Sequence, residues 1–173
     1  MTESKEHLYT RAVSEMKKER WAAAIELFNL RPDVVEASWR FSWEVGWCNF
    51  KLGKFEKARK HMIRATQLAP ENPICKWGLG AVYLERKHFR KAESVLAESL
   101  RVKDSHLTRA SLALAYLSQG KVEEAGHVHL EGIRLKPKDG PRYESYAAFL
   151  SDVGRETEAR AMERKARKLR RSI

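Results

Sequence analysis

Three tryptophans and a phenylalanine are the residues in this sequence whose type and spacing could do chemistry. Trp39, Trp43 and Trp47 are four residues apart, and Phe50 follows them. Residues three or four apart lie on one face of a helix, so the stretch predicts an aromatic stripe. Each ring offers about 150–250 Å² of buriable surface, worth up to roughly 4–6 kcal/mol at about 25 cal/mol per Å². A monomer rarely leaves several such rings together in water, so the chemistry indicated is binding or core packing.

The other reactive side chains do not form a catalytic or metal-binding pattern. His127 and His129 are two residues apart on a predicted helix, point in different directions and cannot share a metal. Cys48 and Cys75 lie in apolar helical segments, which favours reduced core thiols of a cytoplasmic protein. The sequence has no glycine-rich phosphate loop and no nucleophile elbow. We therefore expect no enzyme activity, no cofactor and no metal.

The composition indicates one helical domain with an excess of positive charge. The chain has 173 residues, of which 43% are hydrophobic and 33% charged, with only nine glycines. No apolar run approaches the roughly 20 residues that span a bilayer, and the N-terminus does not resemble a signal peptide. We therefore expect a cytoplasmic protein without a membrane partner. The net charge of +11 favours an acidic partner, but composition alone does not choose among nucleic acid, protein and an anionic surface.

An internal repeat organises the whole sequence. Five alanines, each closing a similar phrase, recur at intervals of 34, 34, 33 and 34 residues. Each copy reads as an amphipathic helix, a tight turn and a second helix on which the alanine packs closely. The predicted repeats cover residues 6–33, 34–72, 73–105, 106–139 and 140–173 of a single domain, 1–173. The five alanines are Ala24, Ala58, Ala92, Ala125 and Ala159.

Local signals place the turns and the helix starts. Asp33 and Glu36 resemble a capping box that would start the tryptophan helix about one turn early, because Pro32 cuts the preceding helix short. Asn72 and Ser105 are the expected starts of first helices in the next two copies. The predicted turn residues are Gly53, Lys87, Gly120 and Gly154.

These copies resemble the tetratricopeptide repeat, whose pattern is W-x2-L-G-x2-Y…A-x3-F…P over 34 residues. The third copy shows it at Leu79, Gly80, Tyr83, Ala92 and Leu96. The resemblance runs from about residue 6 to the C-terminus, and the closing copy, YAAFLSDVGRETEARAMERKARKLR, is similar to the last repeat of bacterial members. It implies an all-α, right-handed superhelical solenoid of antiparallel helix pairs, with about five repeats and a degenerate first one.

The resemblance also implies where the aromatic residues point. In this family the first helix of each pair lines a concave groove, and the large aromatics here stand one position nearer the groove than usual. The groove would turn polar in the last copy, at Glu144 and Asp152. The slots that clamp acidic chaperone tails in some members hold other residues here. The implied groove residues are Trp43, Trp47, Phe50, Trp77, Ala81, Leu84, Ala110, Leu114 and Leu117.

Three coverings of the tryptophans remain open at this stage. The rings would be core if the short first copy or neighbouring helices pack over them. They would be a binding site if a helix or apolar peptide of a partner protein lies on them. A homodimer is the third alternative. We favour a protein-interaction adaptor or scaffold with a protein or peptide ligand.

The lysines and arginines suggest a second hypothesis. Cations surround the predicted turns and fill the C-terminal helix, where they either solvate a terminal repeat or bind phosphates. Nucleic-acid or polyanion binding is therefore the alternative function, less favoured because no nucleic-acid motif accompanies the charge. The candidate basic residues are Lys54, Lys57, Arg86, Lys87, Arg90, Lys91, Arg164, Lys165, Arg167 and Lys168.

Overall fold

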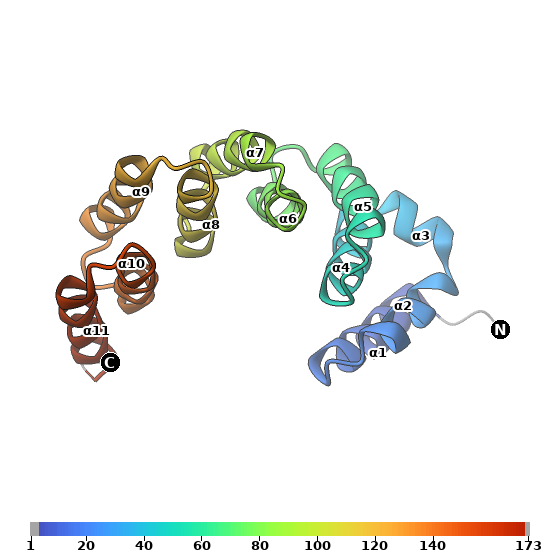
Figure 1. Ribbon diagram of the computed structural model, residues 1–173. Coiled ribbons are helices and arrows are strands. Elements are labelled where there is room, and N and C mark those ends of the chain that lie inside the picture. The colour runs from blue at the N-terminus through green and yellow to red at the C-terminus, as the bar shows by residue number, and fades with distance from the viewer. Residues whose placement is uncertain (1–3, 172–173) are drawn as a thin grey trace. The chain divides into compact units, whose positions relative to one another are not determined.

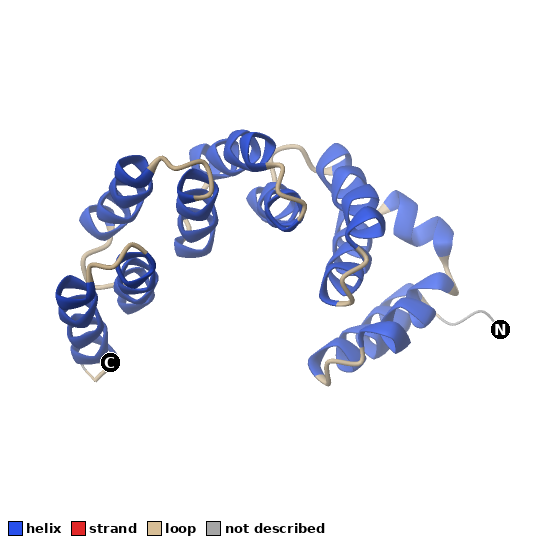
Figure 2. Cartoon of the chain, in the orientation of Figure 1, coloured by secondary structure: helices blue, strands red, loops and turns tan. Residues whose placement is uncertain are grey.

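The computed structural model describes residues 4–171, and in this part of the chain the regular structure is entirely helical (Figures 1 and 2). The chain divides into two compact units, residues 1–88 and 89–173, which are described separately. Unit 1 contains α1 (Lys5–Lys17), α2 (Trp21–Asn29), α3 (Pro32–Ala37), α4 (Trp39–Lys51), α5 (Phe55–Leu68) and α6 (Pro73–Glu85). Unit 2 contains α7 (Phe89–Val102), α8 (His106–Leu117), α9 (Val122–Leu135), α10 (Gly140–Asp152) and α11 (Glu156–Arg170).

Unit 1 is built by helices that pack on their neighbours in chain order. Helix α1 packs on α2, α4 packs on α2 and α5, and α6 packs on α4 and α5. The core between the first two pairs holds Ala12, Phe28, Val35, Phe41 and Val45. The Phe28 and Phe41 rings meet edge to face, with centroids 5.6 Å apart. Local helix–turn–helix contacts therefore supply most of the packing in this unit.

Unit 2 repeats the scheme. Helix α7 packs on α8, α8 on α9, and α10 on both α9 and α11. Its core cluster contains Ala113, Ala125, Tyr146, Phe149, Leu150 and Ala159. The all-helical repeat fold predicted from the sequence is thus confirmed, while the repeat boundaries and the single domain stay predictions.

The recurring alanines are all buried. Ala24, Ala58, Ala92 and Ala125 have no exposed surface, and Ala159 is 3% exposed. A larger side chain at these positions would push the paired helices apart, because helix surfaces in contact leave little free volume.

The turns show the same period in the backbone. Positive φ angles occur at Glu19, Gly53, Lys87, Gly120 and Gly154, again 34, 34, 33 and 34 residues apart. At Gly53 the amide donates to the Phe50 carbonyl, and the next amide donates to Asn49, which closes the end of α4. Glycine reaches this left-handed conformation without steric cost, whereas Glu19 and Lys87 adopt it with a side chain present.

The start of the tryptophan helix differs from the prediction. Residues 32–37 form the separate short helix α3, and α4 begins at Trp39 after a break at Ser38, whose φ and ψ are −117° and 122°. Asp33 is not part of a capping box, because its carboxylate pairs with Arg31 at 2.7 and 2.9 Å. Ser38 leaves the helical region, so the two helices cannot merge.

Two other predicted helix starts are confirmed. The Asn72 side chain accepts a hydrogen bond from the Ile74 amide at 2.9 Å, and Pro73 occupies the first turn of α6. Ser105 is the N-cap residue of α8, although its side chain makes no capping hydrogen bond.

Candidate functional site

The predicted aromatic stripe forms a stacked cluster in unit 1, here called the aromatic ladder and defined as Trp43, Trp47, Phe50 and Trp77. Trp47 is its centre: its ring lies 5.5 Å from Trp43 and 5.1 Å from Phe50, nearly parallel to both. Trp77, from α6, lies 5.4 Å from Trp47 at an angle of 36°. Helices α4 and α6 therefore bring together rings that are 30 residues apart in the sequence.

All four ladder rings are half-buried, which separates them from both core and fully exposed residues. The Trp43 indole N–H donates to the Ile74 carbonyl at 3.1 Å, so its polar edge is satisfied. Gly78 provides the room for this contact, because a Cβ atom there would lie 2.7 Å from the Trp43 nitrogen. The rings shield one another and keep part of their surface accessible.

The aliphatic part of the predicted groove differs between the units. In unit 1, Ala81 and Leu84 of α6 are half-buried. In unit 2, Ala110 and Leu117 are half-buried, but Leu114 is 49% exposed. The polar positions of the last copy, Glu144, Ala148, Ser151 and Asp152, are all exposed. Helix α8 also exposes Leu107, which the sequence reasoning did not place in the groove.

The basic residues of unit 1 surround the turn regions as expected. Lys54, Lys57 and Lys87 are exposed, whereas Arg86 forms an ion pair with Glu56. Lys51 extends over the Trp21 ring, 5.5 Å from its centroid. The cations near the α4–α5 turn are thus partly engaged within the unit.

The basic residues of unit 2 form two groups. Arg90 and Lys91 are exposed at the start of α7. On α11 the exposed cations include Lys165, and an open hollow of about 360 Å³ lies on the same helix. That hollow is lined by Arg164, Arg167, Lys168 and Arg171. Four cations at intervals of three, one and three residues share one helix face.

A cavity that sequence reasoning missed lies between α1, α3 and the start of α4. Its volume is about 700 Å³, and its walls include Tyr9, Val34, Trp39 and Phe41. The Arg40 guanidinium also lines it, 5.7 Å from the Tyr9 ring centre and 5.8 Å from that of Trp39. The break at Ser38 creates this space, and no periodic pattern in the sequence marks it.

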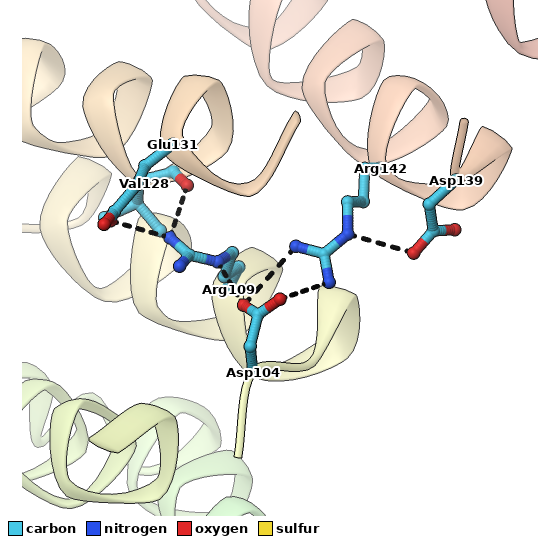
Figure 3. A network of polar contacts seen from close by, with 6 residues as sticks. All are labelled: Asp104, Arg109, Val128, Glu131, Asp139 and Arg142. Carbon is cyan, nitrogen blue, oxygen red and sulfur yellow. Dashed lines mark hydrogen bonds and ion pairs between the residues drawn. The ribbon is translucent and has the colours of Figure 1, made fainter. Parts of the chain in front are cut away.

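A buried ionic network in unit 2 was also missed. The Asp104 carboxylate accepts hydrogen bonds from the guanidinium groups of Arg109 and Arg142, each at 2.6 Å, so one carboxylate bridges two arginines (Figure 3). Arg142 also pairs with Asp139 at 2.9 Å, and Arg109 also donates to Glu131 and to the Val128 carbonyl, each at 3.0 Å. Burial opposes ionisation of Asp104, but hydrogen bonds from Arg142 and Arg109 outweigh it and lower the pKa of the carboxyl.

His129 lies beside this network and is 5% exposed. Its ring packs 5.6 Å from Tyr146 and 5.4 Å from Phe149. Burial, and secondarily the charge of Arg109, lowers its pKa to about 4, so the imidazole is neutral at pH 7. It is a buried histidine that packs against aromatic rings.

The two cysteine thiols are buried. Burial raises the pKa of the Cys48 thiol to about 12 and that of Cys75 to about 11, which makes both poor nucleophiles. Within residues 4–171 no group of three His, Cys, Asp or Glu side chains could hold a metal ion. Among the helices described, none combines the length and apolar character needed to cross a bilayer.

Comparisons with known proteins agree with the fold. Two family models, both described as tetratricopeptide repeat, match residues 9–73 and 49–111. A solved structure of MamA, residues 41 to the end, from Desulfovibrio magneticus RS-1 has a TM-score of 0.74 at 16% identity, covering 96% of this chain and 95% of that one. Another, MamA MSR-1 C2, has a TM-score of 0.68 at 21% identity, covering 96% and 97%.

The curated relatives match this chain over only a small part of their own length. The protein O-mannosyl-transferase TMTC2 of Homo sapiens is 28% identical over 126 residues, which cover 64% of this chain but 15% of TMTC2. The Mus musculus protein is 28% identical over 120 residues, 61% of this chain and 14% of that protein. The chain therefore spans about one seventh of these relatives, and their transferase name describes the whole of those proteins. With its recurring helix pairs, left-handed turns and buried alanines, the chain belongs to the tetratricopeptide repeat family.

Proposed function

We propose that this protein is a cytoplasmic adaptor that holds an apolar helix or peptide of a partner protein on the aromatic ladder of unit 1. Tetratricopeptide repeats support a protein-interaction scaffold in general, and the ladder gives that role a specific surface here. The observation that carries the proposal is the half-buried stack centred on Trp47.

The ladder suits binding because it is both open and rigid. Phe28 and Phe41, on the core side of the same unit, are 0% and 8% exposed, whereas every ladder ring keeps an accessible part. Stacking fixes the rings before a ligand arrives, so little side-chain entropy is lost on binding. Aromatic anchors of this kind dominate the binding energy of protein interfaces.

Unit 2 carries an apolar strip of its own, separate from the ladder. Leu107, Ala110, Leu114 and Leu117 are three or four residues apart and share one face of α8. Leu107 is 50% exposed and Leu114 is 49% exposed. We assign this strip a supporting role, because it lacks the large rings that supply most contact energy. The exposed lysines near the turns, such as Lys54 and Lys57, would steer an acidic partner and make its association sensitive to salt.

A second candidate function rests on α11. The hollow lined by Arg164, Arg167, Lys168 and Arg171 would suit the phosphates of a polyanion, including nucleic acid. Lys165 and the exposed Arg90 and Lys91 of unit 2 would add to the attraction. Such binding would be lost at high salt, whereas the apolar contact with the ladder would persist after its electrostatic steering is screened.

Affinity capture from nuclease-treated lysate at low and high salt tests the two functions together. The variants are Trp47→Ala for the ladder and the pair Arg164→Glu with Arg167→Glu for α11. Leu130→Ala, an exposed apolar residue on α9, is the matched control for loss of apolar surface. Circular dichroism confirms that each variant is folded.

We expect a discrete protein that survives high salt, is lost with Trp47→Ala and is retained by Leu130→Ala. Retention by folded Trp47→Ala would contradict the ladder proposal. Recovery only at low salt, or only without nuclease, together with loss in the α11 variant, would establish polyanion binding instead. Recovery of the chain itself as the sole salt-resistant partner would indicate a homodimer.

A further inference from the structure

We propose that the cavity between α1, α3 and α4 is a second binding site, which takes an acidic side chain of a peptide segment whose neighbouring residues are apolar. Arg40 is the residue assigned to the carboxylate. The site is independent of the aromatic ladder, because its walls come from α1, α3 and the first residues of α4, whereas the ladder begins at Trp43.

The cavity is large enough for a short peptide segment and is mainly apolar. Its volume of about 700 Å³ falls within the range of ordinary ligand pockets, roughly 300–1,000 Å³. Tyr9, Val34, Ala37, Trp39 and Phe41 supply most of its walls. Phe41 also belongs to the core, and its ring centre lies 5.1 Å from that of Tyr9 at an angle of 46°, so this wall is held by well-packed residues.

Arg40 is positioned in this cavity by two aromatic rings. Its guanidinium lies 5.7 Å from the Tyr9 ring centre and 5.8 Å from the Trp39 ring centre. These contacts orient a planar group with five N–H donors, which matches a carboxylate well. Among residues 4–171 Arg40 forms no ion pair within 4.0 Å, although the Glu44 carboxylate one turn away interacts with its charge over a longer distance.

The other charged groups around the cavity already have partners. Lys5 lies 3.8 Å from Glu6, and Arg31 holds Asp33 through two hydrogen bonds. Glu44, one turn after Arg40, accepts the Tyr9 hydroxyl at 3.1 Å. Burial raises the pKa of Glu44, while the hydrogen bond from Tyr9 and the charge of Arg40 partly offset that rise.

This balance of charges selects the occupant. A polyphosphate or nucleic acid, with several negative charges, would meet Glu6 and Asp33 in the walls of the same cavity and would be repelled. A purely apolar segment would cover Arg40 and leave its charge without a partner, which is costly. A single carboxylate with apolar neighbours satisfies both the guanidinium and the walls, and an acidic partner also agrees with the net charge of +11.

The test uses the full chain and two blocked peptides, Ac-Gly-Leu-Glu-Leu-Gly-NH2 and its glutamine counterpart. Binding is followed by the indole N–H signals of the tryptophans in NMR spectra, at peptide concentrations up to about millimolar. Trp39 lines the cavity and reports on it, whereas Trp21 of α2 is the internal control. We expect the Glu peptide to shift the Trp39 signal and the Gln peptide to bind about three- to tenfold more weakly.

Variants at Arg40 complete the test. Arg40→Gln should bind the two peptides equally, and Arg40→Lys should keep a smaller preference for the Glu peptide, because charge remains but planar pairing is lost. Lys54→Gln, the same charge change at an exposed site outside the cavity, should leave the preference intact. If Arg40→Gln did not fold, the comparison of the two peptides on the unaltered chain would still show whether the cavity prefers a carboxylate.

Three results would overturn the proposal: no shift of Trp39 with the Glu peptide, equal affinity for both peptides, or an unchanged preference in folded Arg40→Gln. The result is separable from the ladder proposal through Trp47→Ala. That variant should lose the partner captured by the ladder yet keep the Trp39 shift, since Trp47 does not line the cavity.

Discussion

The two units hold neighbouring helix pairs together through different kinds of side chain. In unit 1 the rings of Trp43, Trp47 and Trp77 fill the contact between α4 and α6. In unit 2, Asp104 links Arg109 of α8 to Arg142 of α10 in a buried ionic network. The same repeat can therefore be connected by stacked rings or by ion pairs.

The two clusters also differ in how deeply their side chains are buried. The side chains of Arg109 and Arg142 are 8% and 3% exposed, and both have carboxylate partners at short distances. The ladder rings are only half-buried, so each keeps some accessible surface. The network therefore stabilises unit 2, whereas the ladder keeps accessible aromatic surface, as the proposed function requires.

The largest expected effect comes from removing the carboxylate at the centre of the network. Asp104→Asn should lower the free energy of unfolding by about 2–4 kcal/mol, because it leaves two buried guanidinium groups without their shared partner. Urea unfolding measures the change. Glu131→Gln is the control, because the Glu131 side chain is 56% exposed and contacts only Arg109 in the network. Equal losses in both variants would show that Asp104 is not central.

Acid should destabilise the protein through His129. Its pKa is lowered to about 4 in the folded state, so below about pH 6.5 the unfolded chain takes up a proton that the folded chain refuses. Stability should fall between about pH 6.5 and 4, by of the order of 2–3 kcal/mol, and His129→Gln should flatten this slope. His127→Gln, exposed on the same helix, should retain the slope. The lowered pKa of Asp104 adds a separate loss, below about pH 4.

Two glycines inside helices should be needed for close packing, one beside the aromatic ladder and one beside the ionic network. A Cβ at Gly78 would lie 2.7 Å from the Trp43 nitrogen, and one at Gly132 would lie 2.7 Å from the Arg109 Cδ atom. Alanine at either position should cost about 1–3 kcal/mol by overpacking, despite its better helix propensity.

Gly126 supplies the contrast on α9. Its nearest neighbour would be a Phe149 ring atom at 3.6 Å, an ordinary contact, so Gly126→Ala should stabilise the chain by up to about 1 kcal/mol. Thermal unfolding of the three alanine variants measures the difference. A gain in stability at Gly78 would mean that the ladder tolerates displacement of Trp43.

The smallest effect should come from the turns that both units share. Lys87 adopts a φ of 57° at the position where the other copies hold Gly53, Gly120 and Gly154. Lys87→Gly should stabilise the protein by about 0.5–1 kcal/mol, because glycine removes the steric cost of the left-handed conformation. The opposite change, Gly120→Ala, should destabilise it, as measured by the same thermal unfolding. No change in either variant would indicate that the turns relax at little cost.

The features that recur could be predicted from the sequence, and the features that do not recur could not. The buried alanines, Gly53 and the Asn72 cap follow from local pattern, and the structure confirms them. The break at Ser38 was not predicted, because Pro32 and Asp33 look like an ordinary helix start. The left-handed Glu19 was also missed, since no glycine marks that turn.

The ionic network is the clearest example of a feature that could not be predicted from the sequence. Asp104 and Arg142 are 38 residues apart, and each is an unremarkable charged residue in its own segment. Only the packing of α8 against α9 and α10 brings the groups together. Likewise the period of the tryptophans predicts a stripe on one helix, but the contact of Trp47 with Trp77 depends on the packing of α6 against α4.

The most direct test of the ladder is to observe its indole signals when the captured partner protein is added. We expect the N–H signals of Trp43, Trp47 and Trp77 to shift together at high salt, while Trp21 of α2 stays in place. A partner that binds without moving these three signals would show that the ladder only packs the helices, and that the protein binds its partner elsewhere.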